Sequence, residues 1–212
     1  MKFRVRILES DKRISESIGN ALIPEIRKYM RTAMDNVKKQ LPEKIYSIIL
    51  SSPEYSSILG GRLKYEFGIP DPADKLEGLL SIWTNNVSVV YTPPSVISGG
   101  RIVSSFSVSM IKSDYTDVLG SGYAEVYDIK RGYTLPWLRW LLLDGSATII
   151  ESHQVVIGSN PRSRTGLAVM RPGPGWSVPK RYAGIRTDNW ITRAIDAGQQ
   201  QIIQLIEGAI KL

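Results

Sequence analysis

The stretch NVSVVYTPPSVISGGRIVSSFSVSMI, residues 86–111, marks the place where the chain changes from helical to strand-like sequence. It holds two runs, residues 86–92 and 101–111, in which apolar and polar residues alternate and β-branched or aromatic residues are frequent. A period of two residues with such side chains is typical of a strand that buries one face. Pro and Gly residues separate the runs, so the stretch predicts two antiparallel strands.

Further runs of the same kind follow at residues 122–129, 147–157 and 166–171. We expect all five runs to belong to one antiparallel sheet. Between the third and the fourth run, residues 134–145 (TLPWLRWLLLDG) are strongly apolar, and they predict a turn followed by a helix that lies across the sheet. Residues 2–8 (KFRVRIL) alternate as well, so they predict a half-buried strand at the N-terminus.

Upstream of this region the sequence has the period of a helix. From residue 14 to residue 41 apolar side chains recur every three or four positions, which predicts a helix of about eight turns with one wide apolar face. Proline has no N–H and its ring clashes with the preceding turn, so Pro24 predicts a kink or a break near Ile23. Pro42 predicts the start of a second, shorter helix that ends at Leu50.

Other helices are predicted at residues 53–67, 71–83 and 188–212. Asp71 and Asp188 are placed to cap the last two of these helices, and Pro72 occupies a first helical position. The final helix carries an apolar stripe at helical spacing. We expect this stripe to pack on the sheet, and the alternative is that it forms a subunit interface.

Together these elements predict an α+β fold in which an antiparallel β-sheet is packed by the long N-terminal helix and the C-terminal helix. Hydrophobic residues make up 42% of the 212 residues and charged residues 22%, so we expect one domain with one core over residues 1–212. Its successive parts are a mainly helical part, an antiparallel sheet, an extended basic arm rich in Gly and Pro, and the C-terminal helix, at residues 1–84, 85–171, 158–187 and 188–212.

The composition excludes several kinds of site. The chain has no cysteine, which excludes a disulfide framework, a thiolate metal site and a cysteine nucleophile. The N-terminus lacks the apolar core of a signal peptide. The densest apolar run, Leu135–Leu143, is interrupted by Arg139 and is too short to span a bilayer. We therefore expect a protein that is made in the cytoplasm and has no membrane partner.

Signatures of catalysis are weak throughout the sequence. His153 is the only histidine, and Glu151 shares its face of a predicted strand. One histidine beside one carboxylate lacks the orienting partner that a general base needs, and the other acids lack the spacing of metal ligands. The sequence also has no Gly-x-Ser-x-Gly elbow, P-loop or dinucleotide fingerprint. We predict that the protein is not an enzyme and has no catalytic residue, cofactor or metal.

The basic arm, residues 158–187, combines cations with aromatic residues. Residues 152–187 contain six basic residues and no acid, in a chain with a net charge of +7. Cations beside Trp176 and Tyr182 are typical of a groove that stacks and neutralises nucleic acid. In the alternative interpretation the arm is an ordered loop whose aromatic residues anchor it to the body while its cations stay in solvent. Non-specific contact with phosphate remains open under both, because it needs only charge and placement.

Four motifs follow one another in the last part of the chain. They are LPWLRWLLLDG, SRTGLAVM, GWSVPKRYAG and DNWITRAI, at residues 135–145, 163–170, 175–184 and 188–195. Together with GRLKYEFGIPDP at residues 61–72, they resemble the neck, head–tail joining and tail-completion proteins of tailed bacteriophages. The resemblance covers residues 60–195. It implies a non-enzymatic structural protein of the virion, which is made in the host cytoplasm and located at the head–tail junction.

The resemblance also implies partners and contact residues. Copies of the chain would form a homo-oligomeric ring, a hexamer or alternatively a twelve-fold ring, around the passage of double-stranded DNA. One face would bind the connector or other portal-side neck proteins, and the other face would bind the tail tube, the sheath or the tail terminator. The implied subunit-interface residues are Arg162, Arg164, Arg171, Trp176, Lys180, Arg181, Tyr182, Arg186 and Trp190. Of these, the candidates for lining the DNA channel are Arg162, Arg164, Lys180 and Arg181.

Within this set, Trp176 and Tyr182 would be desolvated anchors, because aromatic and Arg residues carry most interface energy. The alternative function is that of a non-specific nucleic-acid-binding protein that uses the basic arm.

Overall fold

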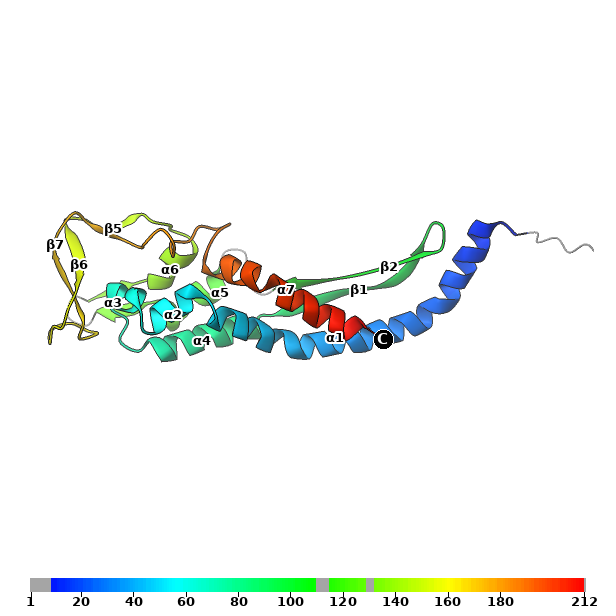
Figure 1. Cartoon of the computed structure of the whole chain (residues 1–212), viewed down its shortest axis with the longest axis horizontal. Coiled ribbons are helices and arrows are strands. Elements are labelled where there is room, and N and C mark those ends of the chain that lie inside the picture. Colours follow the sequence, from blue (N-terminus) through cyan, green and yellow to red (C-terminus); the bar gives the residue numbers. More distant parts are fainter. Residues whose placement is uncertain (1–8, 110–114, 129–131, 212) are drawn as a thin grey trace, which may run out of the picture. The chain divides into compact units, whose positions relative to one another are not determined.

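The computed structural model describes residues 9–109, 115–128 and 132–211, which form helices and pairs of antiparallel strands (Figure 1). The helices are α1 (Asp11–Leu50), α2 (Pro53–Leu59), α3 (Arg62–Phe67), α4 (Pro72–Asn85), α5 (Thr116–Leu119), the 3-10 helix η1 (Gly122–Ala124), α6 (Trp137–Leu142) and α7 (Trp190–Ile210). The strands are β1 (Ser88–Ile97), β2 (Arg101–Ser109), β3 (Val126–Asp128), β4 (Tyr133–Leu135), β5 (Thr148–Ile150), β6 (His153–Ile157), β7 (Ala168–Pro172) and β8 (Trp176–Ser177). This mixture confirms the predicted α+β class. The predicted strand at residues 2–8 lies outside the described residues.

The chain divides into two compact units. Unit 1 comprises the described residues within Met1–Leu41, Ser88–Ser109 and Gln204–Leu212, and unit 2 comprises those within Pro42–Val87 and Met110–Ile203. Helices α1 and α7 contribute residues to both units. The organisation as a single domain stays a prediction.

Helix α1 is continuous over 40 residues. It bends in its N-terminal part, drawn in blue in Figure 1, but no break occurs near Ile23, and Pro42 does not start a new helix. Each proline removes one hydrogen bond from the helix, and the acceptors left over for Pro24 and Pro42 are the carbonyls of Asn20 and Lys38. Both of these residues are exposed, so water can bind their carbonyls and the helix continues.

In unit 1, β1 and β2 form an antiparallel hairpin. The pairing begins with Ser88 opposite Ser109, whose hydroxyl groups form a hydrogen bond of 2.7 Å. The register shifts between Thr92 and Ser95, where β1 contains two prolines. These strands were predicted from their alternation, and the structure confirms them.

Glycines allow the turn of the hairpin to approach α1. Gly99 and Gly100 have φ angles of 83° and 77°, in the left-handed region that other residues rarely adopt. A Cβ atom on Gly100 would lie 2.6 Å from the main chain of Ser15. On the helix, a Cβ atom on Gly19 would lie 3.1 Å from Val96 Cγ2. Larger residues at Gly19 or Gly100 would therefore separate the hairpin from α1.

Unit 2 starts with short helices. The helical piece predicted at residues 53–67 is divided into α2 and α3 by the Gly60–Gly61 pair. Ser52 caps α2, because its Oγ accepts a main-chain N–H of the first turn at 3.2 Å. Helix α4 begins at Pro72 as predicted, but the side chain of Asp71 makes no capping hydrogen bond.

The predicted single sheet is wrong. Among the described residues the strands form four separate two-stranded antiparallel sheets, with the pairs β1–β2, β3–β4, β5–β8 and β6–β7. In unit 2 the strands have two to five residues each, and helix α6 interrupts their succession between β4 and β5. Strands this short, bounded by Gly and Pro, have too few main-chain groups to assemble into one ladder.

Aromatic side chains form the centre of unit 2. The ring of Phe67 lies 6.2 Å from Trp137 and 5.4 Å from Trp176, the latter edge to face. The rings of Trp83 and Trp190 also meet edge to face at 5.1 Å. Of these tryptophans, Trp83, Trp137 and Trp190 are fully buried. Such pairs are worth about 0.5–1.5 kcal/mol beyond the burial of their area.

Helix α7 confirms the predicted C-terminal helix, but Asp188 does not cap it. Asn189 is the cap, because its Oδ1 accepts the N–H groups of Ile191 at 3.1 Å and Thr192 at 3.2 Å. The Oγ1 of Thr192 accepts the N–H of Asn189 in return at 2.8 Å. This reciprocal arrangement is a capping box, and it leaves Asp188 free to bind Arg193.

Candidate functional site

The basic arm is folded onto its own chain. Its first part connects β6 to β7, which pair as a hairpin, and its middle part contains β8, which pairs with β5. The last part, residues 178–187, is held by main-chain hydrogen bonds to α6 and to the turn that follows it. Gly184 donates to the Trp140 carbonyl and accepts from the Gly145 N–H, both at 2.9 Å. The arm is therefore an ordered segment of unit 2.

The aromatic residues expected at a subunit interface are buried inside the same chain. The exposed fractions are 6% for Trp176, 7% for Tyr182 and 0% for Trp190. Little of their surface is left for another subunit. This burial favours the interpretation in which the aromatic residues anchor the arm to the body.

Trp176 lies beside a buried acid, Glu66. One carboxylate oxygen of Glu66 accepts a hydrogen bond from the Arg62 guanidinium, and the side chain of Glu66 is 3% exposed. Burial raises the pKa of Glu66, and the hydrogen bond and charge of Arg62 offset this rise only in part. The indole N–H of Trp176 lowers the same pKa, although it makes no hydrogen bond of good geometry. Trp176 Nε1 and the second carboxylate oxygen of Glu66, Oε2, are both buried without a hydrogen-bond partner among the described residues.

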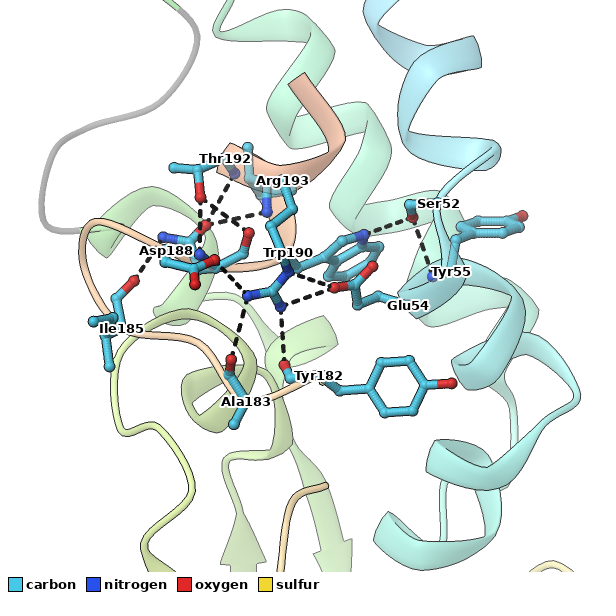
Figure 2. Close-up of polar contacts among 12 residues, drawn as sticks. Ser52, Glu54, Tyr55, Tyr182, Ala183, Ile185, Asp188, Trp190, Thr192 and Arg193 are labelled. Atoms are coloured by element: carbon cyan, nitrogen blue, oxygen red, sulfur yellow. Dashed lines mark hydrogen bonds and ion pairs between the residues drawn. The ribbon is translucent and has the colours of Figure 1, made fainter. Parts of the chain in front are cut away.

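A second buried acid, Glu54, binds α7 to α2 (Figure 2). The Nε and Nη2 groups of Arg193 donate to Glu54 Oε1 at 3.0 and 2.8 Å, and the Glu54 side chain is 3% exposed. The Nη1 group donates to Asp188 Oδ1 at 2.8 Å. Burial alone would lower the pKa of Arg193, but the hydrogen bonds and charges of Asp188 and Glu54 outweigh it and raise that pKa.

The same guanidinium holds the end of the basic arm. Its Nη2 and Nη1 groups donate to the main-chain carbonyls of Tyr182 and Ala183, each at 3.3 Å (Figure 2). Next to it, Trp190 Nε1 donates to Ser52 Oγ at 2.8 Å. Arg193 and Trp190 thus connect the start of α2, the end of the arm and the start of α7. We call Glu54, Asp188 and Arg193 the Arg193 cluster.

A cavity of about 430 Å³ adjoins the Arg193 cluster. Its walls come from the ends of α1, α2 and α7 and from the arm, and they include Ile48, Tyr182 and Ala194. Of the charged groups in the wall, Glu54 and Arg193 are bound to each other, whereas Arg181 forms no ion pair with an acid of the described residues. The Glu54–Arg193 pair in the wall therefore already has a structural role.

A larger groove, of about 610 Å³, lies between α3 and the strand pairs of unit 2. We call it the tyrosine groove. Its lining includes the three tyrosines Tyr65, Tyr127 and Tyr133 and two arginines of the basic arm, Arg162 and Arg164. The Arg164 guanidinium lies 3.8 Å from the Asp128 carboxylate and packs over Gly68, where a Cβ atom would be 3.0 Å from its Nη2.

The structure separates the four candidates for a DNA channel. Arg162 and Arg164 line the tyrosine groove, whereas Arg181 lines the cavity beside the Arg193 cluster and stacks over the Tyr182 ring at 4.5 Å. Lys180 is exposed next to Arg181. The remaining cations of the arm, Arg171 and Arg186, are exposed as well.

The described residues give no support to a catalytic role of His153 or to a metal site. The ring of His153 is exposed, and its Nδ1 lies 3.3 Å from the main-chain oxygen of Glu151 rather than from the carboxylate. In the described ranges, no group of three or more His, Asp and Glu side chains is placed to hold a metal ion. Within those same ranges, each helix is too short or too polar to cross a bilayer.

Sequence reasoning missed the buried charges. Glu54 and Glu66 lie on short helices, and Arg62 four residues before Glu66 suggests only a surface ion pair. The partners of Glu54 lie more than 130 residues away, so no local pattern could reveal them. Asn189 had a detectable signal, because an Asn directly before the apolar run is as good a cap as Asp188.

Comparisons of the chain with protein-family models, with curated proteins and with solved structures give no significant match.

Proposed function

We propose that this chain is a non-enzymatic structural protein of a bacteriophage virion. Copies of it form a ring at the head–tail junction, around the passage of DNA, and join the connector to the tail. The proposal starts from the resemblance of residues 60–195 to neck and tail-completion proteins. Its structural support comes from the basic arm.

The observation that carries the proposal is that buried residues hold the main chain of the basic arm in place while its cations are exposed. The arm is fixed within unit 2 by the buried side chains of Trp176 and Tyr182 and by the hydrogen bonds from the Arg193 guanidinium to main-chain carbonyls of the arm. Of its six cations, Arg164 lies within 4.0 Å of a carboxylate, and no such pair links the other five to an acid of the described residues. Cations carried by a fixed main chain suit DNA or an acidic neighbouring protein, because binding then requires little ordering of the backbone.

The motifs of the resemblance support the same assignment. Trp137, Trp176, Tyr182, Trp190 and Arg193 all lie in these motifs, and each contributes to the packing or to the hydrogen bonds of unit 2. The motif residues therefore specify one folded region. A rigid ring requires such a region, from which the cations project.

The test is to detect the chain in purified particles by mass spectrometry and to image particles assembled without it. We expect the chain to be present, with density at the junction, and we expect full heads and separate tails in its absence. Particles that lack the chain and still join heads to tails normally would refute the proposal.

Non-specific binding of nucleic acid is the second candidate function, and the five cations without an ion pair favour it. It predicts that affinity for duplex DNA falls steeply with salt, with a slope that loses about 0.9 for each phosphate contact removed. Changing Arg162, Arg164, Lys180 and Arg181 to Ala tests this. A matched control removes the same charge from the exposed side of α1, with Lys28, Arg31, Lys38 and Lys39 changed to Ala. Equal slopes for both variants would exclude the arm as the DNA-binding surface.

A further inference from the structure

The β1–β2 hairpin is a two-stranded ribbon to which no third strand is added in the described part of the chain. Of its ten and nine strand residues, only Pro94 is buried. A ribbon of two strands is marginally stable in water, and its unpaired main-chain groups are a template for another strand. We infer that the outer edge of β2 pairs with the same edge of a second copy of this chain.

The two edges of the ribbon differ in their capacity to pair. In β1, Pro93 and Pro94 lack N–H groups and coincide with the shift of register. Prolines and irregular pairing are devices that block an edge. β2 contains no proline, and its nine residues, RIVSSFSVS, carry a single charge at Arg101. Only the β2 edge is therefore open to a long partner strand.

Charge identifies the occupant as a second copy. The whole chain has a net charge of +7, so most surfaces of two copies repel each other. From Ser88 to Ser109 the only charged residue is Arg101, and the exposed face of the ribbon consists mainly of Ser, Thr and Val. An acidic or basic partner would find no complementary charge there. Two copies can meet along this neutral edge without bringing like charges together.

The geometry of such a pair follows from the sequence of β2. Ser105 is the middle residue of Arg101–Ser109, so an antiparallel pair in full register places it opposite its own copy. In that register Ile102 lies opposite Val108 of the second copy, and both are apolar residues of the same face. Val108 is 37% exposed in the single chain and would gain this partner.

Because the same edge is used twice, the contact has two-fold symmetry and closes on itself. It does not extend into a ring or a fibre. We therefore assign this contact to the free protein, in which it protects the β2 edge from aggregation. The inference does not depend on the proposed function.

Cysteine cross-linking tests the pairing directly, since the chain contains no cysteine. Residues opposite each other in antiparallel strands have Cα atoms about 4.5–5.5 Å apart, within the reach of a disulfide. Ser105→Cys should therefore form a disulfide-linked dimer under mild oxidation. Thr92→Cys is the matched control, because Thr92 is exposed and lies opposite Ser105 on β1. The two copies of Thr92 would be three strand spacings apart, roughly 14 Å, which is too far to cross-link.

Light scattering on the unmodified protein and on Ser105→Lys completes the experiment. We expect a dimer for the unmodified protein. For Ser105→Lys we expect a dissociation constant raised on the order of tenfold, because two Lys side chains would then face each other. Unchanged circular dichroism would show that the variant folds. A monomeric unmodified protein, equal cross-linking of both Cys variants, or a Ser105→Lys variant that dimerises as before would each overturn the inference. None of these results depends on whether the chain is found in virions.

Discussion

The Arg193 cluster allows a quantitative prediction. In the variant Arg193→Met, Glu54 loses its cation while its side chain stays 97% buried, given its exposure of 3%. The carbonyls of Tyr182 and Ala183 lose their donors at the same time. Breaking a buried ion pair costs about 3–5 kcal/mol, and we take the lower limit because the Arg193 side chain is 30% exposed. The expected loss in the free energy of unfolding is therefore about 3 kcal/mol.

Urea unfolding followed by tryptophan fluorescence measures this loss, and a thermal melt should show a Tm lower by roughly 6–12 °C. Arg186→Met is the matched control, because Arg186 belongs to the basic arm and is exposed. Its stability should stay within about 0.5 kcal/mol of the unmodified protein.

A double variant tests whether the loss comes from the pair itself. When Glu54→Met is added to Arg193→Met, the charge left behind is removed, so the double variant should lose less stability than the sum of the single variants. Additive losses would show that the two side chains act independently. A loss below about 0.5 kcal/mol for Arg193→Met would refute the view that this residue holds the arm.

Three further predictions concern unit 2. Gly184→Ala should unfold or severely destabilise the protein, because its Cβ would lie 1.9 Å from the Leu141 carbonyl oxygen, whereas Gly158→Ala, with nothing within 4 Å, should be neutral in the same thermal melt. The raised pKa of Glu66 means that the folded state binds its proton more tightly than the unfolded state. Stability should therefore fall as the pH rises from the ordinary value of 4.5 through the raised pKa, and Glu66→Gln should remove this fall in urea titrations over a pH series. Asn189→Ala removes the cap of α7 and should lower the free energy of unfolding by about 1–2 kcal/mol, and a helix that kept full stability without it would contradict the capping role.

Local patterns in the sequence predicted the helical character of α1 and α7, but they missed α5 and placed a strand at residues 122–124, where η1 lies. The apolar period of α1 and of α7 is repeated over many turns, so it outweighs single unfavourable residues. Pro24 and Pro42 are such residues. Pro24 predicted a kink or a break and Pro42 a new helix, but α1 is continuous at both, because the carbonyls that they leave unpaired are exposed. The effect of a proline therefore depends on which side of the helix faces water, and the sequence leaves that undecided until the core is known.

The arrangement of the strands and the candidate site could not be predicted to the same degree. Alternation identifies β1, β2 and β6, but it contains no information on which strands pair. The predicted interface residues Trp176 and Trp190 are buried in their own chain. A tryptophan next to cations has the same local sequence in a core and in an interface, and the difference arises from distant partners such as Phe67 and Ser52.

The long separation between the partners of the Arg193 cluster has a consequence for biosynthesis. Glu54 leaves the ribosome 139 residues ahead of Arg193, which at 5–20 residues per second is a delay of roughly 7–28 s. During this time α2 carries an acid that lacks its cation, and Ser52 lacks the tryptophan that later binds it. In a chain interrupted before α7, Glu54 and Ser52 would lack these partners and α2 would be more open to proteases, so the synthesis of α7 becomes a condition for a stable fold of unit 2.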